Sequence, residues 1–331
     1  MAIFSLRSLG FKPSSAPTNA QATPGRSRLQ ESIEKALAWS EANAEILRNP
    51  LSKTADTFGA LNSHSRSFLG EQIAELRGSL SRGDTKGCSL ALHELAERAI
   101  LAGSMDGLKV FLSASAQTHG LALVAISRDE PALLRLLLQR GADANESGPL
   151  GQSLARIAIL RLQSDSLRIL LEFGAKMTPD ERGAPGHWLA GIWHRPEIAP
   201  SLANLQENAE RKDSRFHRAS GCLLALKDAG QSLNLLNAEG RAPLALALSG
   251  LIDPRELSAW LAAGAQTAGV DGQQVSPLEA FVLSTWRPLP SFEELAEVLN
   301  AHEADFMAIG PSGRSAFDLA TPEMKLILEA L

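Results

Sequence analysis

The sequence repeats itself with a period of about 33 residues, and this periodicity constrains the fold more than any other feature. A leucine-rich segment at residues 133–138 is followed by Gly141, and a similar segment at residues 167–173 is followed by Gly174, with 174 − 141 = 33. The leucines of the first segment recur at helical spacing. A glycine directly after a helix can adopt the left-handed conformation that ends it. The sequence therefore predicts helices that begin and end at a fixed interval.

Further copies of the pattern follow toward the C-terminus. Gly230 and Gly264 close two later segments, with 264 − 230 = 34, and Glu303 takes the place of the glycine in a last, degraded copy. Short segments that open a helix precede the closing residues, at 151–155, 240–247, 276–280 and 313–320. The order of opening, helix and closing residue indicates a two-helix unit repeated along the chain.

These features resemble the ankyrin-repeat family, whose unit is a turn followed by two helices and opens near Thr-Pro-Leu-His-x-Ala. The resemblance covers about residues 84–331. It implies an all-α, ankyrin-type helical solenoid of about six divergent helix-turn-helix repeats, which binds a partner protein through its turns and the concave face of its inner helices. The family's opening histidine is replaced by Ala155, Ala245, Glu279 and Asp318. We therefore expect apolar stacking to hold the units together more than polar bonds between them.

Residues 1–28 differ from the rest of the chain. They contain four basic residues and no acidic one, a charge of +4, so the remaining 28 basic and 37 acidic residues give −9. Their proline and serine content predicts disorder. The segment resembles the export signal of bacterial type III effectors and also an organelle transit peptide, and a plain tail is the third reading.

Residues 29–83 are predicted to be helical but out of phase with the repeats. Their amphipathic pattern fits an N-terminal cap that covers the apolar face of the first unit, because the terminal units of a solenoid need a polar outer face. A separate region that docks a partner is the alternative. At the other end, the short charged helix expected at 322–331 reads as a C-terminal cap.

The unit that ends at Gly230 is 23 residues longer than the period, which predicts an insertion at about 183–221. This stretch contains Trp188, Trp193 and a basic run at 211–218. Tryptophan and arginine are enriched in interface hot spots, and long insertions often lie on the binding face. The alternative is that the tryptophans pack inside the unit and the basic run is solvated. The candidate partner-binding residues, from the turns and the insertion, are Asn145, Glu146, Ser147, Arg182, His187, Trp188, Trp193, Arg195, Arg215 and Arg241.

Motifs that carry chemistry are scarce. The sequence has no phosphate-binding loop, no Cys-x-x-Cys pair and no nucleophile elbow. His93 begins a His-Glu-x-x pattern that ends in Glu97, where a zinc protease needs a second histidine, so we interpret His93 as the first unit's counterpart of the opening histidine. The sequence therefore predicts no enzymatic activity, no cofactor and no metal. The candidate ligands for a zinc site are His187, His194, His217 and Cys222. Their spacing in the sequence matches no compact set of zinc ligands, which argues against the site.

Charge and cysteine content limit the partners and the compartment. The net charge of −5 gives no overall attraction to nucleic acid or anionic lipid. No apolar run approaches the ~20 residues of a membrane span. Cys88 and Cys222 are predicted to be buried in a reducing compartment. We expect a monomer that binds a protein partner, in the cytoplasm or exported by a bacterium into a host cell.

Three functional classes follow from the sequence. The first is a protein-protein interaction module, such as a bacterial effector that acts in a host cell. The second is an immunity or inhibitor protein that neutralises a toxin in the producing cell, since an acidic body suits a basic partner. The third is an enzyme with an unrecognised site in residues 29–116 or in the insertion.

Overall fold

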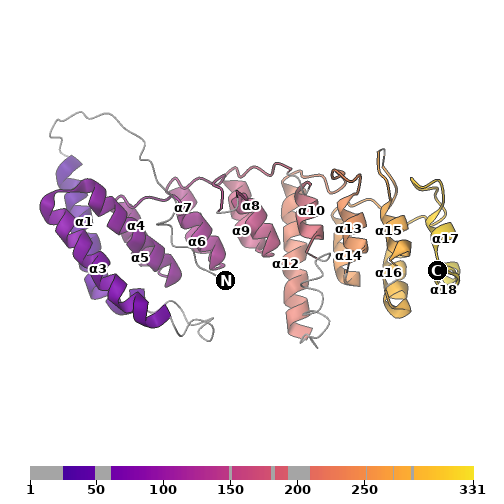
Figure 1. The fold of residues 1–331 in the computed structure, drawn as a ribbon, viewed down its shortest axis with the longest axis horizontal. Coiled ribbons are helices and arrows are strands. Elements are labelled where there is room, and N and C mark those ends of the chain that lie inside the picture. Colours follow the sequence, from indigo (N-terminus) through magenta and orange to yellow (C-terminus); the bar gives the residue numbers. More distant parts are fainter. Residues whose placement is uncertain are drawn as a thin grey trace.

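The helices of this chain stand side by side in an elongated row. The computed structural model describes residues 25–48, 61–148, 151–179, 183–192, 209–250, 252–270, 272–284 and 287–331. Figure 1 shows the N-terminal helices at one end of the row and α18 at the other, with the connecting turns along one edge. No β-strand forms in these residues, only isolated bridges in the turns.

The described part of the chain contains seven consecutive helix pairs. They are α4 (Thr85–Leu101) with α5 (Met105–Ser113), α6 (Leu121–Ser127) with α7 (Pro131–Gln139), α8 (Leu154–Leu160) with α9 (Ser164–Glu172), α10 (Pro185–Ala190) with α12 (Ala209–Asp228), α13 (Pro243–Leu248) with α14 (Pro254–Ala262), α15 (Pro277–Leu283) with α16 (Leu289–Ala301), and α17 (Ala316–Leu319) with α18 (Pro322–Ala330). The first helices of successive pairs contact one another and form an inner row, and the second helices form an outer row. The predicted all-α array of two-helix units is confirmed, and the helix expected at 322–331 is the second helix of the seventh pair.

Local sequence explains where these helices begin and end. Proline occupies the first turn of α7, α10, α13, α14, α15, α16 and α18, where a missing N–H is harmless. Gly141, Gly174, Gly230 and Gly264 have positive φ values of 92°, 82°, 68° and 101°, as the sequence predicts for the residues that close the second helices. Glu303 takes the same conformation at the degraded copy, with φ of 59°.

The core is one continuous apolar cluster that runs the length of the row. Leu137 of α7 and Leu170 of α9 are fully buried in it, between neighbouring units. Farther along, the rings of Phe281 and Phe292 stack between α15 and α16 with centroids 4.4 Å apart. Each unit thus buries its apolar surface against the units before and after it.

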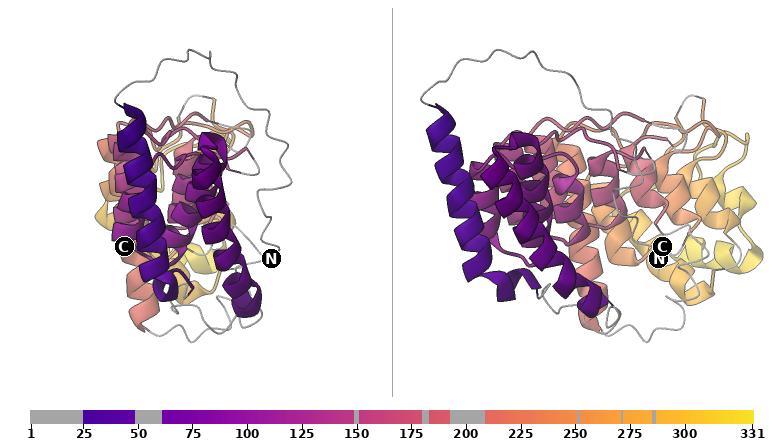
Figure 2. Two further views of the ribbon diagram at one scale, coloured as in Figure 1. Left: turned by 90° about the vertical axis from the view of Figure 1, so that its left-hand side faces the viewer. Right: turned by 60° about the vertical axis from the view of Figure 1, so that its left-hand side comes forward.

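Three helices precede the first unit: α1 (Gly25–Ala42), α2 (Ala44–Arg48) and α3 (Leu61–Arg82), with α2 packed on α1 and α3. α3 packs on α4 and α1 packs on α5, so together they extend both rows, as the view along the row shows (Figure 2). Trp39 of α1 meets Phe111 edge-on at 5.5 Å and lies over Gly107, where an added Cβ would be 2.6 Å from its ring. These contacts are those that a cap requires, and its role as a cap remains a prediction.

α1 begins a few residues before the end of the predicted leader, whose boundary at about residue 28 stays a prediction. The helix begins at Gly25, because Arg26, Ser27 and Arg28 contain nothing that breaks a helix and extend it by one turn beyond Leu29. Residues 1–24 lie outside the described residues.

The turns between units form short hairpins. The N–H of residue i donates to the carbonyl oxygen of residue i+4 at 148–152 (2.8 Å), at 237–241 (3.0 Å) and at 310–314 (2.8 Å). A glycine with positive φ stands at the fourth position of each hairpin: Gly151, Gly240 and Gly313. Neighbouring hairpins also bond to each other, since the N–H of Gln274 donates to the carbonyl oxygen of Gly240 at 3.0 Å.

We predict that Leu137→Ala lowers the free energy of unfolding by about 2–5 kcal/mol, because a fully buried leucine between two units leaves a cavity. Chemical denaturation measures this change. The matched control is Leu326→Ala on α18, where 68% of the residue is exposed and little change is expected. A loss below about 1 kcal/mol at Leu137 would contradict its place in the core.

Candidate functional site

Asn145 and Asn234 act as bridges between units, although Asn145 was a candidate for partner binding. Each lies four residues after a closing glycine. The side-chain amide of Asn145 donates to the carbonyl oxygen of Gly174 (3.3 Å), and its side-chain oxygen accepts from the N–H of Lys176 (2.7 Å). Asn234 makes the same two bonds to Gly264 (3.0 Å) and Gln266 (2.8 Å). Both carboxamides are therefore committed to the next unit of the array.

Glu146 and Ser147, the next two candidates, also lie within the array. The Glu146 carboxylate accepts from the N–H of Gly120 at 2.7 Å and contacts His119, so it holds the start of α6 in the preceding unit. Ser147 forms an isolated antiparallel bridge with Ser153 at the base of its hairpin. The turn at 145–147 is thus held from both sides.

His187 belongs to an inner helix and not to an insertion. It is the third residue of α10, after Ala184 at the N-cap and Pro185 in the first turn, which is the position of histidine in the family's opening pattern. Its Nδ1 accepts from the N–H of Ala184 (3.1 Å), so its Nε2–H donates to the carbonyl oxygen of Arg241 (2.9 Å). The extra residues of the insertion predicted at about 183–221 therefore follow α10 and precede the end of α12.

The third residue of each inner helix can now be compared with the residues that the sequence analysis matched to the family's opening histidine, and one match, Ala155, is wrong. In α8, whose N-cap is Ser153, the third residue is Arg156 and not Ala155. Ala245, Glu279 and Asp318 do occupy this position in α13, α15 and α17.

Trp188 is buried, with 4% of the residue exposed, and the Arg156 guanidinium lies 5.4 Å from the centre of its ring. This favours the reading in which the tryptophan packs inside the array. Replacing it by alanine would remove core packing, so weaker binding by that variant would not identify a direct contact.

The basic run of the predicted insertion forms the first half of α12. Arg215 lies 3.7 Å from the buried carboxylate of Glu256 on α14, and Arg218 pairs with Asp129 at 3.1 Å. The long helix is thereby fastened to its neighbours. Of the remaining candidates, Arg182, Trp193 and Arg195 lie outside the described residues.

Arg241, the last candidate, lines a hollow on the inner row. The hollow has a volume of about 180 Å³ and lies between α13 and α15, with Ala245 and Ser249 on one wall and Ala280 and Leu283 on the other. Leu283 is 51% exposed. The backbone of Arg241 is fixed from two sides, since its carbonyl oxygen accepts from His187 and its N–H donates to Asn237 (2.9 Å).

The hollow lies beside a small residue that stands where other inner helices have larger ones. Ala245 stands at the position that Arg156, His187 and Glu279 fill in the other inner helices. Small-molecule sites usually measure ~300–1,000 Å³, so this hollow suits a single side chain of a partner better than a whole ligand.

Two buried ionic side chains next to the hollow were missed by the sequence analysis. Arg287 donates through Nη2 to the carbonyl oxygens of Leu248 (2.7 Å) and Gly250 (2.8 Å), and burial lowers its pKa to about 10. Glu279 accepts from the N–H groups of Ser276 (2.6 Å) and Ser312 (3.1 Å). Burial alone would raise the pKa of Glu279, but these hydrogen bonds lower it overall. Both residues join neighbouring units, so polar bonds between units are more frequent than expected.

Reactive groups of the described residues have structural roles. His93 bonds through Nδ1 to the carbonyl oxygen of Gln117 in the next unit, at 2.9 Å. Cys88 and Cys222 are buried free thiols, and burial raises the pKa of Cys222 to about 12, which keeps it protonated. No group of three or more potential metal ligands occurs among the described residues, and of the four zinc candidates His194 lies outside them. None of the described helices is both long and apolar enough to cross a membrane.

We predict that His187 makes the stability of the chain depend on pH. Burial, the larger effect, lowers its pKa below the ordinary value of about 6.5, although its two hydrogen bonds act the opposite way. The unfolded chain then binds a proton at a pH where the folded chain does not, so the free energy of unfolding falls as the pH drops through about 6.5. His187→Gln removes this contribution. Denaturation of both proteins between about pH 7.5 and pH 5.5 tests it, and parallel curves would contradict the assignment.

Comparison with known proteins gives similarity at the level of structure. No protein-family model matches the chain, and no curated protein matches it. Similar solved structures include the ankyrin repeat domain of Bcl-3, a member of the IkappaB protein family, with 18% identity over 71% of this chain and 97% of that chain at a TM-score of 0.48. The ankyrin repeat domain of human ASB11 has 21% identity over 72% of this chain and 96% of that chain, also at a TM-score of 0.48. The helix pairs, closing glycines and hairpin turns described above give this chain the fold of an ankyrin-repeat array.

Proposed function

We propose that this chain is a protein-protein interaction module that binds a partner through the inner row, around the hollow between α13 and α15. The observation that carries the proposal is an exposed leucine, Leu283, at the wall of a hollow left by Ala245 and Ala280. A partner's apolar side chain would enter this hollow. Arg241, whose side chain is partly exposed, would then face an acceptor group of the partner.

The geometry suits recognition because the walls of the hollow are fixed before binding. The backbone of Arg241 is held by His187 and Asn237, and its hairpin is paired with Val275 of the next one. A preformed site loses little conformational entropy when the partner binds. The rigidity of the stacked units therefore contributes directly to affinity.

We predict that Leu283→Asp weakens binding of the partner by roughly 2 kcal/mol or more, about 30-fold, because it places a carboxylate where an apolar side chain docks. The partner is first captured with the wild-type chain and then titrated against purified variants. Ile46→Asp on α2 is the matched control, since Ile46 is 47% exposed and lies at the other end of the row. Equal affinity of the Leu283→Asp variant and the wild type would reject the hollow as the binding site.

The finer hypothesis is that the module is a bacterial effector that acts in a host cell, and the acid-free composition of residues 1–28 supports it. An immunity or inhibitor protein is the alternative that the acidic body supports. The enzyme alternative in residues 29–116 is weaker, because His93 bonds to Gln117 and Glu94 accepts from Gln72 at 2.9 Å within the packing of α3 and α4.

An export assay separates the effector from the immunity protein. If the chain is an effector, deletion of residues 1–28 abolishes its secretion by a bacterium with a type III system. The deleted chain still binds the partner through the inner row, and Leu283→Asp still weakens that binding. Secretion unaffected by the deletion, or no secretion of the full chain, would remove the effector hypothesis.

A further inference from the structure

A bridge between units is missing at the junction of α9 and α12. The residue four positions after Gly174 is Thr178, where Asn145 and Asn234 stand in the tied units. The side chain that bonds to the backbone N–H of the asparagine, two residues before it, is missing as well. Asp143 accepts from the N–H of Asn145 (2.8 Å) and Ser232 from that of Asn234 (3.2 Å), whereas Lys176 occupies this place before Thr178.

The missing bridge leaves two solvent-exposed backbone groups without a partner among the residues that the structure describes. At the tied junctions the carboxamide bonds to the carbonyl oxygen of the next closing glycine and to the N–H two residues later. The equivalent groups here are the carbonyl of Gly230 and the N–H of Ser232. Within the described residues neither group takes part in a hydrogen bond, and both residues are exposed.

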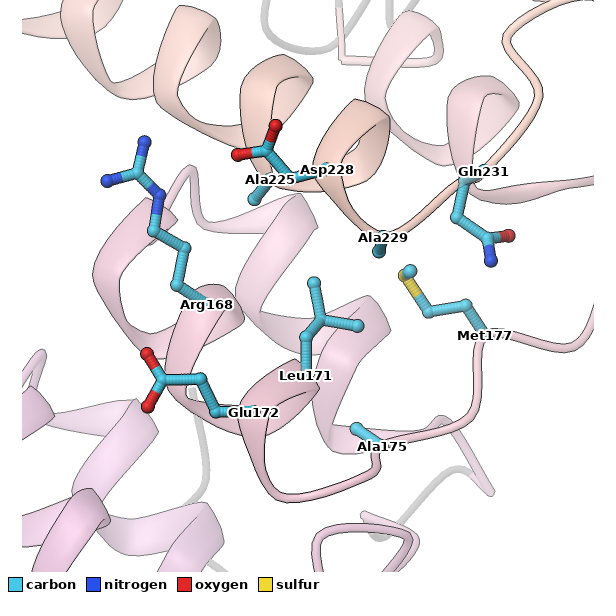
Figure 3. A pocket seen from close by; sticks show the side chains of 9 residues that line it. All are labelled: Arg168, Leu171, Glu172, Ala175, Met177, Ala225, Asp228, Ala229 and Gln231. Carbon is cyan, nitrogen blue, oxygen red and sulfur yellow. The ribbon is translucent and has the colours of Figure 1, made fainter.

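A groove of about 520 Å³ lies beside these two groups, on the outer row between α9 and α12. We call it the outer groove. Figure 3 shows Leu171 pointing into it from α9 and Met177 reaching toward Ala229 at the end of α12. Ala229 and Gln231, on either side of Gly230, both line the groove. The unpartnered carbonyl and N–H are therefore at its edge, next to an apolar floor.

The charges around the outer groove favour a neutral occupant. Glu172 is paired with Arg135 at 2.6 Å, which leaves Arg168 and Asp228, of opposite sign, among the lining residues. A carboxamide is neutral and carries both a donor and an acceptor, so it can serve the Gly230 carbonyl and the Ser232 N–H together. A carboxylate has no donor, and an ammonium group has no acceptor.

We propose that the outer groove binds an extended segment of a protein partner that presents an asparagine or glutamine side chain to Gly230 and Ser232, and an aliphatic side chain to the floor formed by Leu171, Met177 and Ala229. The occupant takes the place that the array's own asparagine fills at the two tied junctions. This surface lies on the row opposite the hollow between α13 and α15, so the proposal is independent of the proposed function. An open groove between two helices accommodates a peptide segment better than an enclosed ligand.

Selection of displayed random peptides on the full chain tests the proposal. The selected peptides should share an asparagine or glutamine next to an aliphatic residue. In the best peptide, replacing the amide residue by its acid should weaken binding at least about tenfold, because the donor is lost and the carbonyl of Gly230 loses its partner. An absence of selected peptides, or a peptide whose acid version binds equally well, would overturn it.

Variants of the chain locate the binding. Ala229→Arg places a long side chain in the outer groove and should abolish binding of the selected peptide. The double variant Lys176→Asp with Thr178→Asn introduces the residue types of Asp143 and Asn145, and should both compete with the peptide and raise the stability of the chain. Ala262→Arg, at an exposed alanine at the end of α14, is the matched control and should bind normally, as should Leu283→Asp. Binding retained by Ala229→Arg would overturn the proposal.

Sedimentation of the wild-type chain alone tests whether a second copy of the chain occupies the outer groove. A dimer that Ala229→Arg dissociates would show that the outer groove joins two copies of this chain, which would overturn the proposal of a separate partner. We expect the wild-type chain and the Ala229→Arg variant to sediment identically.

Discussion

The structure depends on sideways stacking of helices that are too short to be stable alone. α6 and α8 have seven residues each, whereas isolated helices need roughly 12–15 residues to be even marginally stable in water. Their stability therefore comes from the neighbouring units, which bury one apolar cluster along the whole row. An array of this kind exposes apolar surface wherever it ends. α1 and α3 contact the first unit, and α17 and α18 contact the sixth, as helices that cap the two ends would.

Polar side chains at two recurring positions tie neighbouring units together, and each of the two proposed surfaces lies at a junction where one of these positions lacks its tie. The third residue of the inner helix is one position: His187 and Glu279 bond across to the next hairpin, while Ala245 leaves a hollow. The position four residues after the closing glycine is the other: Asn145 ties two units, and Thr178 leaves the outer groove. Each surface proposed for binding thus lies where the array lacks one of its own internal contacts, and the neighbouring units show which chemistry fits there.

The sequence predicted the fold well because its strongest signals are local. The leucine stripe before Gly141 and the glycines at 174, 230 and 264 fix the second helices without reference to the rest of the chain. The fourth unit was harder, because its extra residues shift the register and made His187 and Trp188 look like part of an insertion. The packing of α10 between α8 and α13, and the bond from His187 to the Arg241 carbonyl 54 positions away, show that α10 is an ordinary inner helix. Two candidates chosen from a turn, Asn145 and Glu146, bridge units. Their partners lie about one repeat away in the sequence, so no local pattern reveals them.

The enlarged fourth unit connects the two surfaces. α10 is buried on all sides, and α12 reaches Asp129 in the second unit through Arg218 and Glu256 in the fifth through Arg215. One end of α12 forms a wall of the outer groove, while His187 of α10 holds the backbone of Arg241 at the hollow. The two surfaces belong to opposite rows and share no lining residue, so occupying one does not block the other. Their relative position is instead fixed by the packing of a single unit, so both proposed surfaces depend on the pair formed by α10 and α12.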